Sequence, residues 1–213
     1  METIKVSELK KIWEPEAQGK ITKWNQIRPE WPDKEIKLYG AGSDSGTFDY
    51  FTEAINGKSK ASRGDYTASE DDNVLVQGVE GDKHALGYMG FAYYEAHQKR
   101  LKALGIEWDA KGKSPVTPSE GTVLAGTYNP LSRPLFIYVN VKSLEKPEVK
   151  KFVEFYLGNV ARLTKEVKYI PLPDSAYTAV RERLAKLQIG TAFAGHAEMA
   201  IPIAEILKRT PTP

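Results

Sequence analysis

The sequence contains no cysteine, and histidine occurs only three times in 213 residues. The absence of cysteine excludes disulfides, thiolate metal sites and a cysteine nucleophile, although it does not settle the compartment. The histidines His84, His97 and His196 do not stand at the spacing of metal ligands, and we expect each of them at the surface. The sequence therefore predicts no metal site, no cofactor and no catalytic histidine.

Long apolar runs are missing as well. The chain has no stretch of roughly eighteen apolar residues, so no membrane-spanning helix is expected. The opening residues METIKVSELKK lack the apolar core of a secretory signal peptide. The formal net charge is only +2, and the 30 basic and 28 acidic residues are interspersed. Because no concentrated basic face is visible, we expect no nucleic-acid partner.

The segments that are present alternate between strand and helix patterns. Strands are predicted at residues 35–40 and 134–141, and residues 85–96 form a strand or a strand followed by a helix. Helices are predicted at residues 7–13, 47–55, 74–79, 145–157 and 175–187. Ser7 is expected to cap the first of these helices, and Ser69 is expected to cap the helix that contains the apolar run 74–79. This alternation predicts the α/β class.

The stretch YGAGSDSGTFDYF, residues 39–51, places a glycine-rich loop between a strand and a helix. The first N–H groups of a helix have no intrahelical partner, and the macrodipole adds positive potential, so such an end favours a phosphate, sulfate or carboxylate. Ser45 and Thr47 would add hydroxyl donors, and Gly46 would let a ligand approach the backbone. The alternative left open is that Ser45 only caps its own helix.

Three more specific sequence motifs are only partly matched in this region, and none of them is complete. The dinucleotide-binding pattern that begins at Gly40 has Ser45 at its sixth position, and no acidic residue ends a strand about twenty residues later. The stretch Gly57-Lys58-Ser59 follows a helix, whereas a P-loop opens one. A nucleophile elbow would need serine in place of Asp44. With no base and no metal in position, we expect binding and no enzymatic activity.

Four longer blocks carry a resemblance to a known family. The segments GAGSDSGTFDYFTEAI, ASRGDYTASEDDNVLVQGV, ALGYMGFAYY and PLSRPLFIYV occur in this order, and VKYIPLPDSAY follows at residues 167–177. Together they resemble the periplasmic phosphate-binding protein of the phosphate-specific ABC importer, in its cyanobacterial type. The resemblance implies a two-lobed α/β class II periplasmic-binding-protein fold, phosphate as ligand, an ABC transporter permease as partner, and a periplasmic or cell-surface location.

The resemblance also implies a set of ligands. In the family an SGT motif at the start of a helix grips the phosphate oxygens with hydroxyl and N–H groups. Carried over onto this chain, the phosphate-binding residues are Ser45, Gly46 and Thr47, with Asp44 beside them.

One departure concerns the charge that should accompany this motif. Many members carry an arginine four residues before the serine, and this chain has Ala41 there. Arg63 is the candidate replacement, because a guanidinium binds phosphate in bidentate fashion. The alternative for Arg63 is a surface ion pair with Asp65 or Glu70. For Arg133 we expect a structural role.

A second departure concerns the extent of the chain. Family members begin with an N-terminal lobe segment that has no counterpart before Met1, so we expect a truncated, split or excised form. Residues 1–130 would then be the second, SGT-containing lobe, and residues 131–213 the crossover strand and C-terminal helices that belong to lobe one. The helices at 145–157 and 175–187 would lose their natural cover and could pair in a homodimer.

The leading interpretation is therefore a binding protein. The chain would bind inorganic phosphate as the solute-binding component of an ABC importer, or as a fragment of one, without chemistry. One alternative is an excised lobe that acts only as a folding or interaction module. A less favoured alternative is a phosphomonoesterase that uses Ser45, for which the sequence offers neither a base nor a metal.

Overall fold

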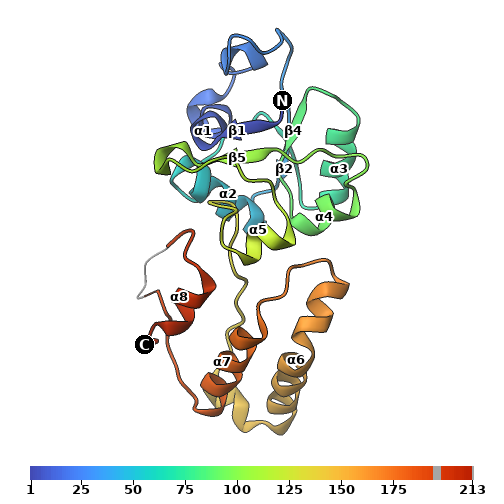
Figure 1. Cartoon of the computed structure of the whole chain (residues 1–213). Coiled ribbons are helices and arrows are strands. Elements are labelled where there is room, and N and C mark those ends of the chain that lie inside the picture. Colours follow the sequence, from blue (N-terminus) through green and yellow to red (C-terminus); the bar gives the residue numbers. More distant parts are fainter. Residues whose placement is uncertain (194–197, 213) are drawn as a thin grey trace. The chain divides into compact units, whose positions relative to one another are not determined.

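The computed structural model describes residues 1–193 and 198–212, so His196 lies outside the described residues. The chain divides into two compact units (Figure 1). The first unit comprises Met1–Ser119 and Tyr128–Leu131, and the second comprises Glu120–Thr127 and Ser132–Pro213. The assignment of residues on either side of position 130 to two lobes of a binding protein stays a prediction.

The first unit is built on short parallel strands. Strand β2 (Lys37–Ala41) lies between β3 (Thr67–Ser69) and β4 (Ala85–Gly87), and both pairings are parallel. A second parallel pair joins β1 (Thr3–Lys5) to β5 (Gly105–Glu107). Because β2, β3 and β4 run in the same direction, their carboxyl ends share one edge of the sheet, which is the edge where α/β proteins bind ligands.

Helices alternate with these strands. They are α1 (Val6–Trp13), α2 (Gly46–Asn56), α3 (Asp72–Glu80) and α4 (Phe91–Ala96), with 3₁₀ turns at Pro15–Ala17, Trp24–Gln26 and Asp109–Lys111. The predicted α/β class is confirmed, as are the strand near residues 35–40, the helix at 47–55 and the strand followed by a helix within 85–96. Among the described residues, none of the helices is long and apolar enough to cross a membrane.

Two predicted helix caps are wrong. Ser7 lies inside α1, whose N-cap is Lys5. The N-cap of α3 is Asp71, whose carboxylate accepts a hydrogen bond from the N–H of Asn73 over 2.9 Å. Ser69 is instead the last residue of β3. Aspartate caps a helix as well as serine does, and pairing with β2 keeps Ser69 in the sheet.

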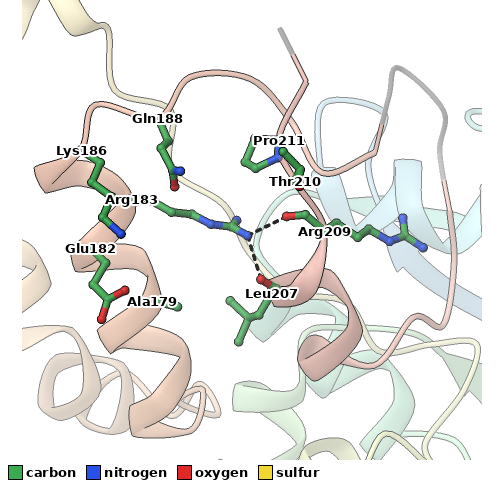
Figure 2. Close-up of a pocket in the computed structure, with 9 residues that line it drawn as sticks. All are labelled: Ala179, Glu182, Arg183, Lys186, Gln188, Leu207, Arg209, Thr210 and Pro211. Carbon is green, nitrogen blue, oxygen red and sulfur yellow. Dashed lines mark hydrogen bonds between the residues drawn. The ribbon is translucent and has the colours of Figure 1, made fainter.

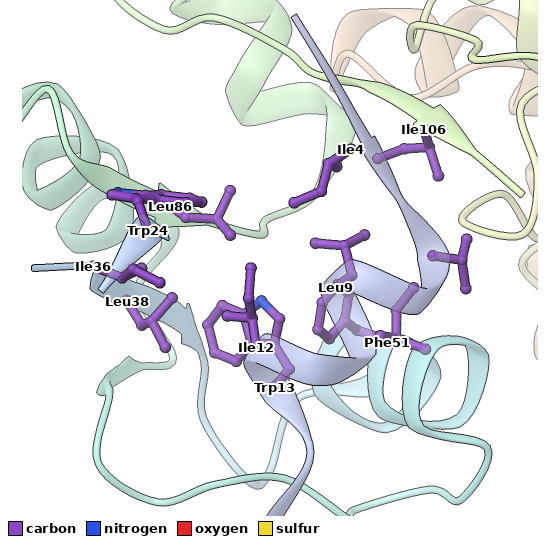
Figure 3. Close-up of a cluster of buried hydrophobic side chains, with 12 residues drawn as sticks. Ile4, Leu9, Ile12, Trp13, Trp24, Ile36, Leu38, Phe51, Leu86 and Ile106 are labelled. Carbon is purple, nitrogen blue, oxygen red and sulfur yellow. The ribbon is translucent and has the colours of Figure 1, made fainter. Parts of the chain in front are cut away.

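Trp13, at the end of α1, lies in the centre of the core of the first unit (Figure 3). Its ring lies edge-on to Phe51, Tyr66 and Tyr88, with centroid distances of 5.5, 5.4 and 5.0 Å. Phe51 in turn stacks on Tyr88, with their centroids 3.8 Å apart. Edge-on and stacked pairs are favourable beyond the area that they bury. These rings therefore fasten α2 to α1 and to the segment that follows β4.

The second unit consists of helices. It contains α5 (Glu120–Leu124), a 3₁₀ turn at Val141–Glu145, α6 (Pro147–Glu166), α7 (Asp174–Ala185) and α8 (Ile203–Lys208). The helices predicted at 145–157 and 175–187 are confirmed, although α6 continues for another two turns. Pro147 opens α6, in the first turn, where an N–H would have no intrahelical partner in any case.

Arg183 joins α7 to the end of α8 (Figure 2). Its guanidinium donates to the carbonyl oxygens of Leu207 and Arg209 over 2.9 and 3.0 Å. Such carbonyls at the end of a helix have no intrahelical donor. Arg209 itself forms ion pairs with Glu198 and Glu205 over 2.7 and 3.1 Å. Both arginines line the pocket shown in Figure 2, and their hydrogen bonds and ion pairs stabilise the position of α8.

The strand predicted at residues 134–141 is wrong. Residues 132–140 belong to no strand or helix, and Leu135 and Tyr138 are 62% and 89% exposed. A strand is stable only where another strand pairs with its backbone, and the described part of the chain places no strand beside this run. The apolar composition of residues 134–141 is typical of a strand, but the described residues include no strand that pairs with them.

We expect Trp13→Ala to lower the free energy of unfolding of the first unit by about 3–5 kcal/mol, the range for deleting a large buried aromatic side chain. The physical reason is the loss of contact with three aromatic rings. Urea denaturation followed by circular dichroism measures the change. As a control, Val74→Ala trims a side chain that is 44% exposed, and it should change the stability by less than about 0.5 kcal/mol. Equal losses for the two variants would contradict the central role of Trp13.

Candidate anion-binding site

The glycine loop joins β2 to α2 at the edge where the parallel strands end. Ser45 is the N-cap of α2, and its Oγ accepts a hydrogen bond from the N–H of Thr47 over 3.1 Å. The N–H of Ser45 donates to the carbonyl of Gly42 over 3.1 Å, which closes a tight turn. At its other end α2 stops at Gly57, whose φ of 81° is the left-handed conformation that glycine adopts readily.

The capping role left open for Ser45 is thus present in the structure. It does not compete with anion binding, because the Oγ of Ser45 acts only as an acceptor in the cap and its O–H is still a donor. Within the described residues, the hydroxyl of Thr47 makes no hydrogen bond. Two hydroxyl donors therefore stand at the positive end of an eleven-residue helix.

A carboxylate lies on the same loop. Glu70 directly follows β3, and its Oε1 accepts a hydrogen bond from the N–H of Asp44 over 3.2 Å. A Cβ built on Gly42 would lie 2.2 Å from that oxygen, so the carboxylate rests against the Gly42 backbone. From the sequence, Glu70 was only an alternative partner for Arg63. Its position beside the loop follows from the parallel register that pairs Ala41 with Ser69.

The guanidinium of Arg63 forms its hydrogen bonds with groups outside the glycine loop. Its side chain is only 4% exposed, and its guanidinium donates to the two carboxylate oxygens of Asp65 over 2.5 and 2.8 Å. The Nη1 atom also donates to the carbonyls of Ile12 and Ile21 over 3.0 and 2.9 Å. The bonds to Ile12 and Ile21 tie the end of α1 and the segment after it to the loop that follows α2. We therefore correct the predicted ligand role of Arg63 to a structural one: buried Arg63 pairs with partly exposed Asp65, one of its two alternative partners.

Two tyrosines lie beside the start of the loop. The hydroxyl of Tyr66 donates to the carbonyl of Ala41 over 3.0 Å, and Tyr88 makes a longer contact of 3.5 Å with the same oxygen. Burial is the main cause that raises the pKa of both tyrosines, and the charge of Glu70 raises the pKa of both further. Both hydroxyls therefore stay protonated throughout the neutral range.

The remaining candidates lie away from the loop or are not drawn into it. His84 and His97 are both partly exposed, and Nδ1 of His97 lies 2.7 Å from the carbonyl oxygen of Tyr93. Arg133 is exposed in the second unit. Among residues 1–193 and 198–212, no three side chains gather that could hold a metal ion.

Comparisons with known proteins bear on this site. Residues 2–160 match the family described as PBP superfamily domain. The protein SphX of Synechocystis sp. is 51% identical over 210 residues, which cover 98% of this chain and 62% of that protein. The phosphate-binding protein PstS of Staphylococcus haemolyticus is 37% identical over 173 residues, which cover 80% of this chain and 51% of that protein.

A solved structure is also similar. The crystal structure of a possible phosphate binding protein from Planctomyces limnophilus superposes with a TM-score of 0.76 at 48% sequence identity. The match covers 87% of this chain and 64% of that one. The chain thus spans less than two thirds of the length of each of these three proteins.

We expect the stability to fall between pH 4 and pH 2 because of Asp65. Hydrogen bonds from Arg63 are the largest cause that lowers the pKa of Asp65, from 3.8 to about 2. A pKa that is depressed in the folded state gives a stabilisation that is complete above the unfolded value and is lost as the pH falls through the folded value. Acid titration of the free energy of unfolding measures this slope.

The variant Asp65→Asn tests the assignment. It should remove this part of the acid slope and lower the stability at neutral pH by about 2 kcal/mol, less than for a fully buried pair because Asp65 is partly exposed. Asp33→Asn is the matched control, because Asp33 pairs with Lys23 on the surface and is 62% exposed. An acid slope that persists in Asp65→Asn would show that Arg63 and Asp65 do not form the pair described.

Proposed function

The chain belongs to the PBP superfamily, and from this premise we propose that it binds inorganic phosphate at the amino end of α2 without converting it chemically. The observation that carries the proposal is the loop at residues 42–47. It stands at the carboxyl edge of a parallel sheet and presents the hydroxyls of Ser45 and Thr47 at the positive end of a helix.

The comparisons support phosphate as the anion. One relative carries the name phosphate-binding protein, and the similar solved structure is titled a possible phosphate binding protein. The predicted residues Ser45, Gly46 and Thr47 fall together in the first turn of α2 and its cap, and Asp44 precedes them in the turn. A tetrahedral oxyanion with several acceptor oxygens suits the hydroxyl and backbone donors at the start of a helix.

Binding without chemistry is the favoured activity. A serine nucleophile needs a base that accepts its O–H proton. Within the described residues, Oγ of Ser45 only accepts a hydrogen bond, from the N–H of Thr47, and no base accepts its O–H. This arrangement favours a binding loop over the phosphomonoesterase alternative. The proposal further includes delivery of the ligand to an ABC transporter permease, at the periplasmic side or at the cell surface, as the family resemblance implies.

The affinity of this site should be low. Ser43, Asp44 and Gly46 are exposed, so a bound anion stays in contact with water. In such a place each hydrogen bond replaces one made with solvent, and its net contribution is small. We therefore expect a dissociation constant for phosphate in the millimolar range, which is about −4 kcal/mol.

The hydroxyl of Thr47 provides the test of this site. Thr47→Ala should weaken phosphate binding about ten-fold, because a hydrogen bond to a charged acceptor is lost. Thr47→Ser keeps the hydroxyl and should bind as the unmodified chain does. Amide chemical shifts of residues 43–48, followed by NMR during a phosphate titration, give the dissociation constants. Shifts that never appear in this loop, or a large loss of thermal stability with unchanged affinity, would contradict the proposed role.

A second proposal concerns self-association of the 213-residue chain. Phe152 and Phe155 are 66% and 60% exposed, and their spacing places them on one face of α6. The run 135–138 is exposed as well. Monomeric proteins seldom leave large apolar side chains clustered in water, because burying them is the dominant favourable term in association. We propose that two copies of this chain pair through such faces of the second unit, in a two-fold homodimer.

Light scattering over a range of protein concentrations tests the homodimer. The measured mass should rise toward that of two chains as the concentration increases. The double substitution Phe152→Ser with Phe155→Ser should move this equilibrium toward the monomer by about ten-fold or more. Glu154→Ser changes an exposed polar residue of the same helix and should have no effect. A chain that stays monomeric at every concentration would refute the pairing.

A further inference from the structure

Asn56 and Gly57 form the only asparagine–glycine sequence in the 213 residues. Asparagine is a chemically labile residue, and deamidation is easiest before glycine, because glycine has no side chain to block attack by its own amide nitrogen. Asn56 is the last residue of α2, and Gly57 is the C-cap. The residue that ends α2 therefore makes its neighbour chemically labile.

Deamidation at such a sequence proceeds through a succinimide ring. The amide nitrogen of Gly57 bonds to Cγ of Asn56, and the bond from Cγ to Nδ2 breaks. The Nδ2 group takes the proton of the Gly57 N–H and leaves as ammonia. Water then opens the ring, either at Cγ to give aspartate or at the main-chain carbonyl to give an isoaspartyl linkage. Water is the co-reactant, and no oxidation or reduction occurs.

In the folded chain both reacting groups are held by hydrogen bonds. Nδ2 of Asn56 donates to the carbonyls of Trp13 and Ala61 over 3.2 and 2.7 Å. The N–H of Gly57 donates to the carbonyl of Glu53 over 3.0 Å. Ring closure requires the nitrogen of Gly57 to leave that bond and the peptide unit after Asn56 to rotate out of its helical orientation. The fold therefore keeps the labile pair out of the reactive geometry.

The same contacts would disfavour the product. An aspartate at position 56 would place an oxygen against the carbonyl oxygens of Trp13 and Ala61, and none of the three can donate a hydrogen bond. Its second oxygen would take the place of Oδ1, which is buried and has no hydrogen-bond partner among the described residues. Burying an ionised carboxylate without a donor is costly. An isoaspartyl linkage would in addition insert Cβ into the main chain at the end of α2.

On these grounds we propose that Asn56 is a modification site that is closed in the folded chain and becomes reactive when the first unit unfolds. Deamidation then makes the unfolding irreversible, because the product cannot restore the junction between α2 and Trp13. The inference goes beyond the proposed function and does not require an anion at α2. It gives the chain a chemical lifetime that depends on the time that it spends unfolded.

Incubation of the full chain at mildly alkaline pH tests the closed state. One sample is kept folded in buffer and the other unfolded in guanidinium chloride, and peptide mapping by mass spectrometry measures the deamidated fraction at Asn56. We expect the rate to be at least about ten-fold higher in denaturant, because a protected group reacts only in molecules that have opened locally. Asn140 is the internal reference. It is exposed but precedes a valine, so it should react slowly in both samples.

Ile189→Asn supplies a matched control, because it creates a second asparagine–glycine sequence, before Gly190. Ile189 lies in an irregular segment and is 57% exposed. In the folded variant, the residue introduced at position 189 should deamidate at least about ten-fold faster than Asn56, and in denaturant the two should react at similar rates. Equal rates in the folded variant would overturn the proposal, because the sequence alone would then set the reactivity.

Asn56→Asp reproduces one product of the reaction. It should lower the urea midpoint of the first unit, and by more than Asn56→Ala, which removes the same amide but adds no charge. After long incubation of the unmodified chain in denaturant, the refolded fraction should fall in step with the deamidated fraction. An unchanged midpoint for Asn56→Asp, or full refolding of deamidated chains, would refute the irreversibility. If Asn56→Asp does not fold at all, the refolded fraction of the unmodified chain still decides the question.

Discussion

The position of Trp13 is the constraint on which the first unit depends. Its ring contacts aromatic side chains from α2 and from the segment after β4, and its carbonyl accepts hydrogen bonds from the N–H of Arg63 and the amide of Asn56 over 3.1 and 3.2 Å. One residue thereby fixes both the face of α2 and the chain that follows α2. The amino end of α2 points where it does because its carboxyl half is held at Trp13. The ion pair of buried Arg63 with partly exposed Asp65 stabilises the same junction.

Features that depend on neighbours in sequence could be predicted. Ser45 before α2 and Gly57 after it follow from the chemistry of helix ends, which needs only a few residues of context. The strand at 134–141 could not be judged in that way, because pairing requires a distant segment and the pattern of one strand does not reveal whether its partner is present. The cap at Ser69 failed for a similar reason, since β3 pairs with β2 through that residue.

The difference between local and long-range contacts also explains which parts of the site could be predicted. The SGT residues could be placed from local pattern and resemblance, because loop, cap and helix are contiguous. Arg63 was misjudged because its carbonyl partners Ile12 and Ile21 lie about forty to fifty residues away. Glu70 was overlooked as part of the loop, and only the alignment of β2 with β3 brings it there. A usable signal existed: a carboxylate directly after one parallel strand lies near the loop that follows its neighbour.

Under the proposed function, affinity depends on how completely the anion leaves water. Ser43, Asp44 and Gly46 are exposed, so each hydrogen bond from this loop would replace one that the anion makes with solvent, and its net contribution would be small. The hydroxyls of Ser45 and Thr47 can therefore fix the position of an anion more readily than they can supply tight binding. Tight binding would require further donors that cover the anion, because a hydrogen bond is electrostatically stronger where water is excluded.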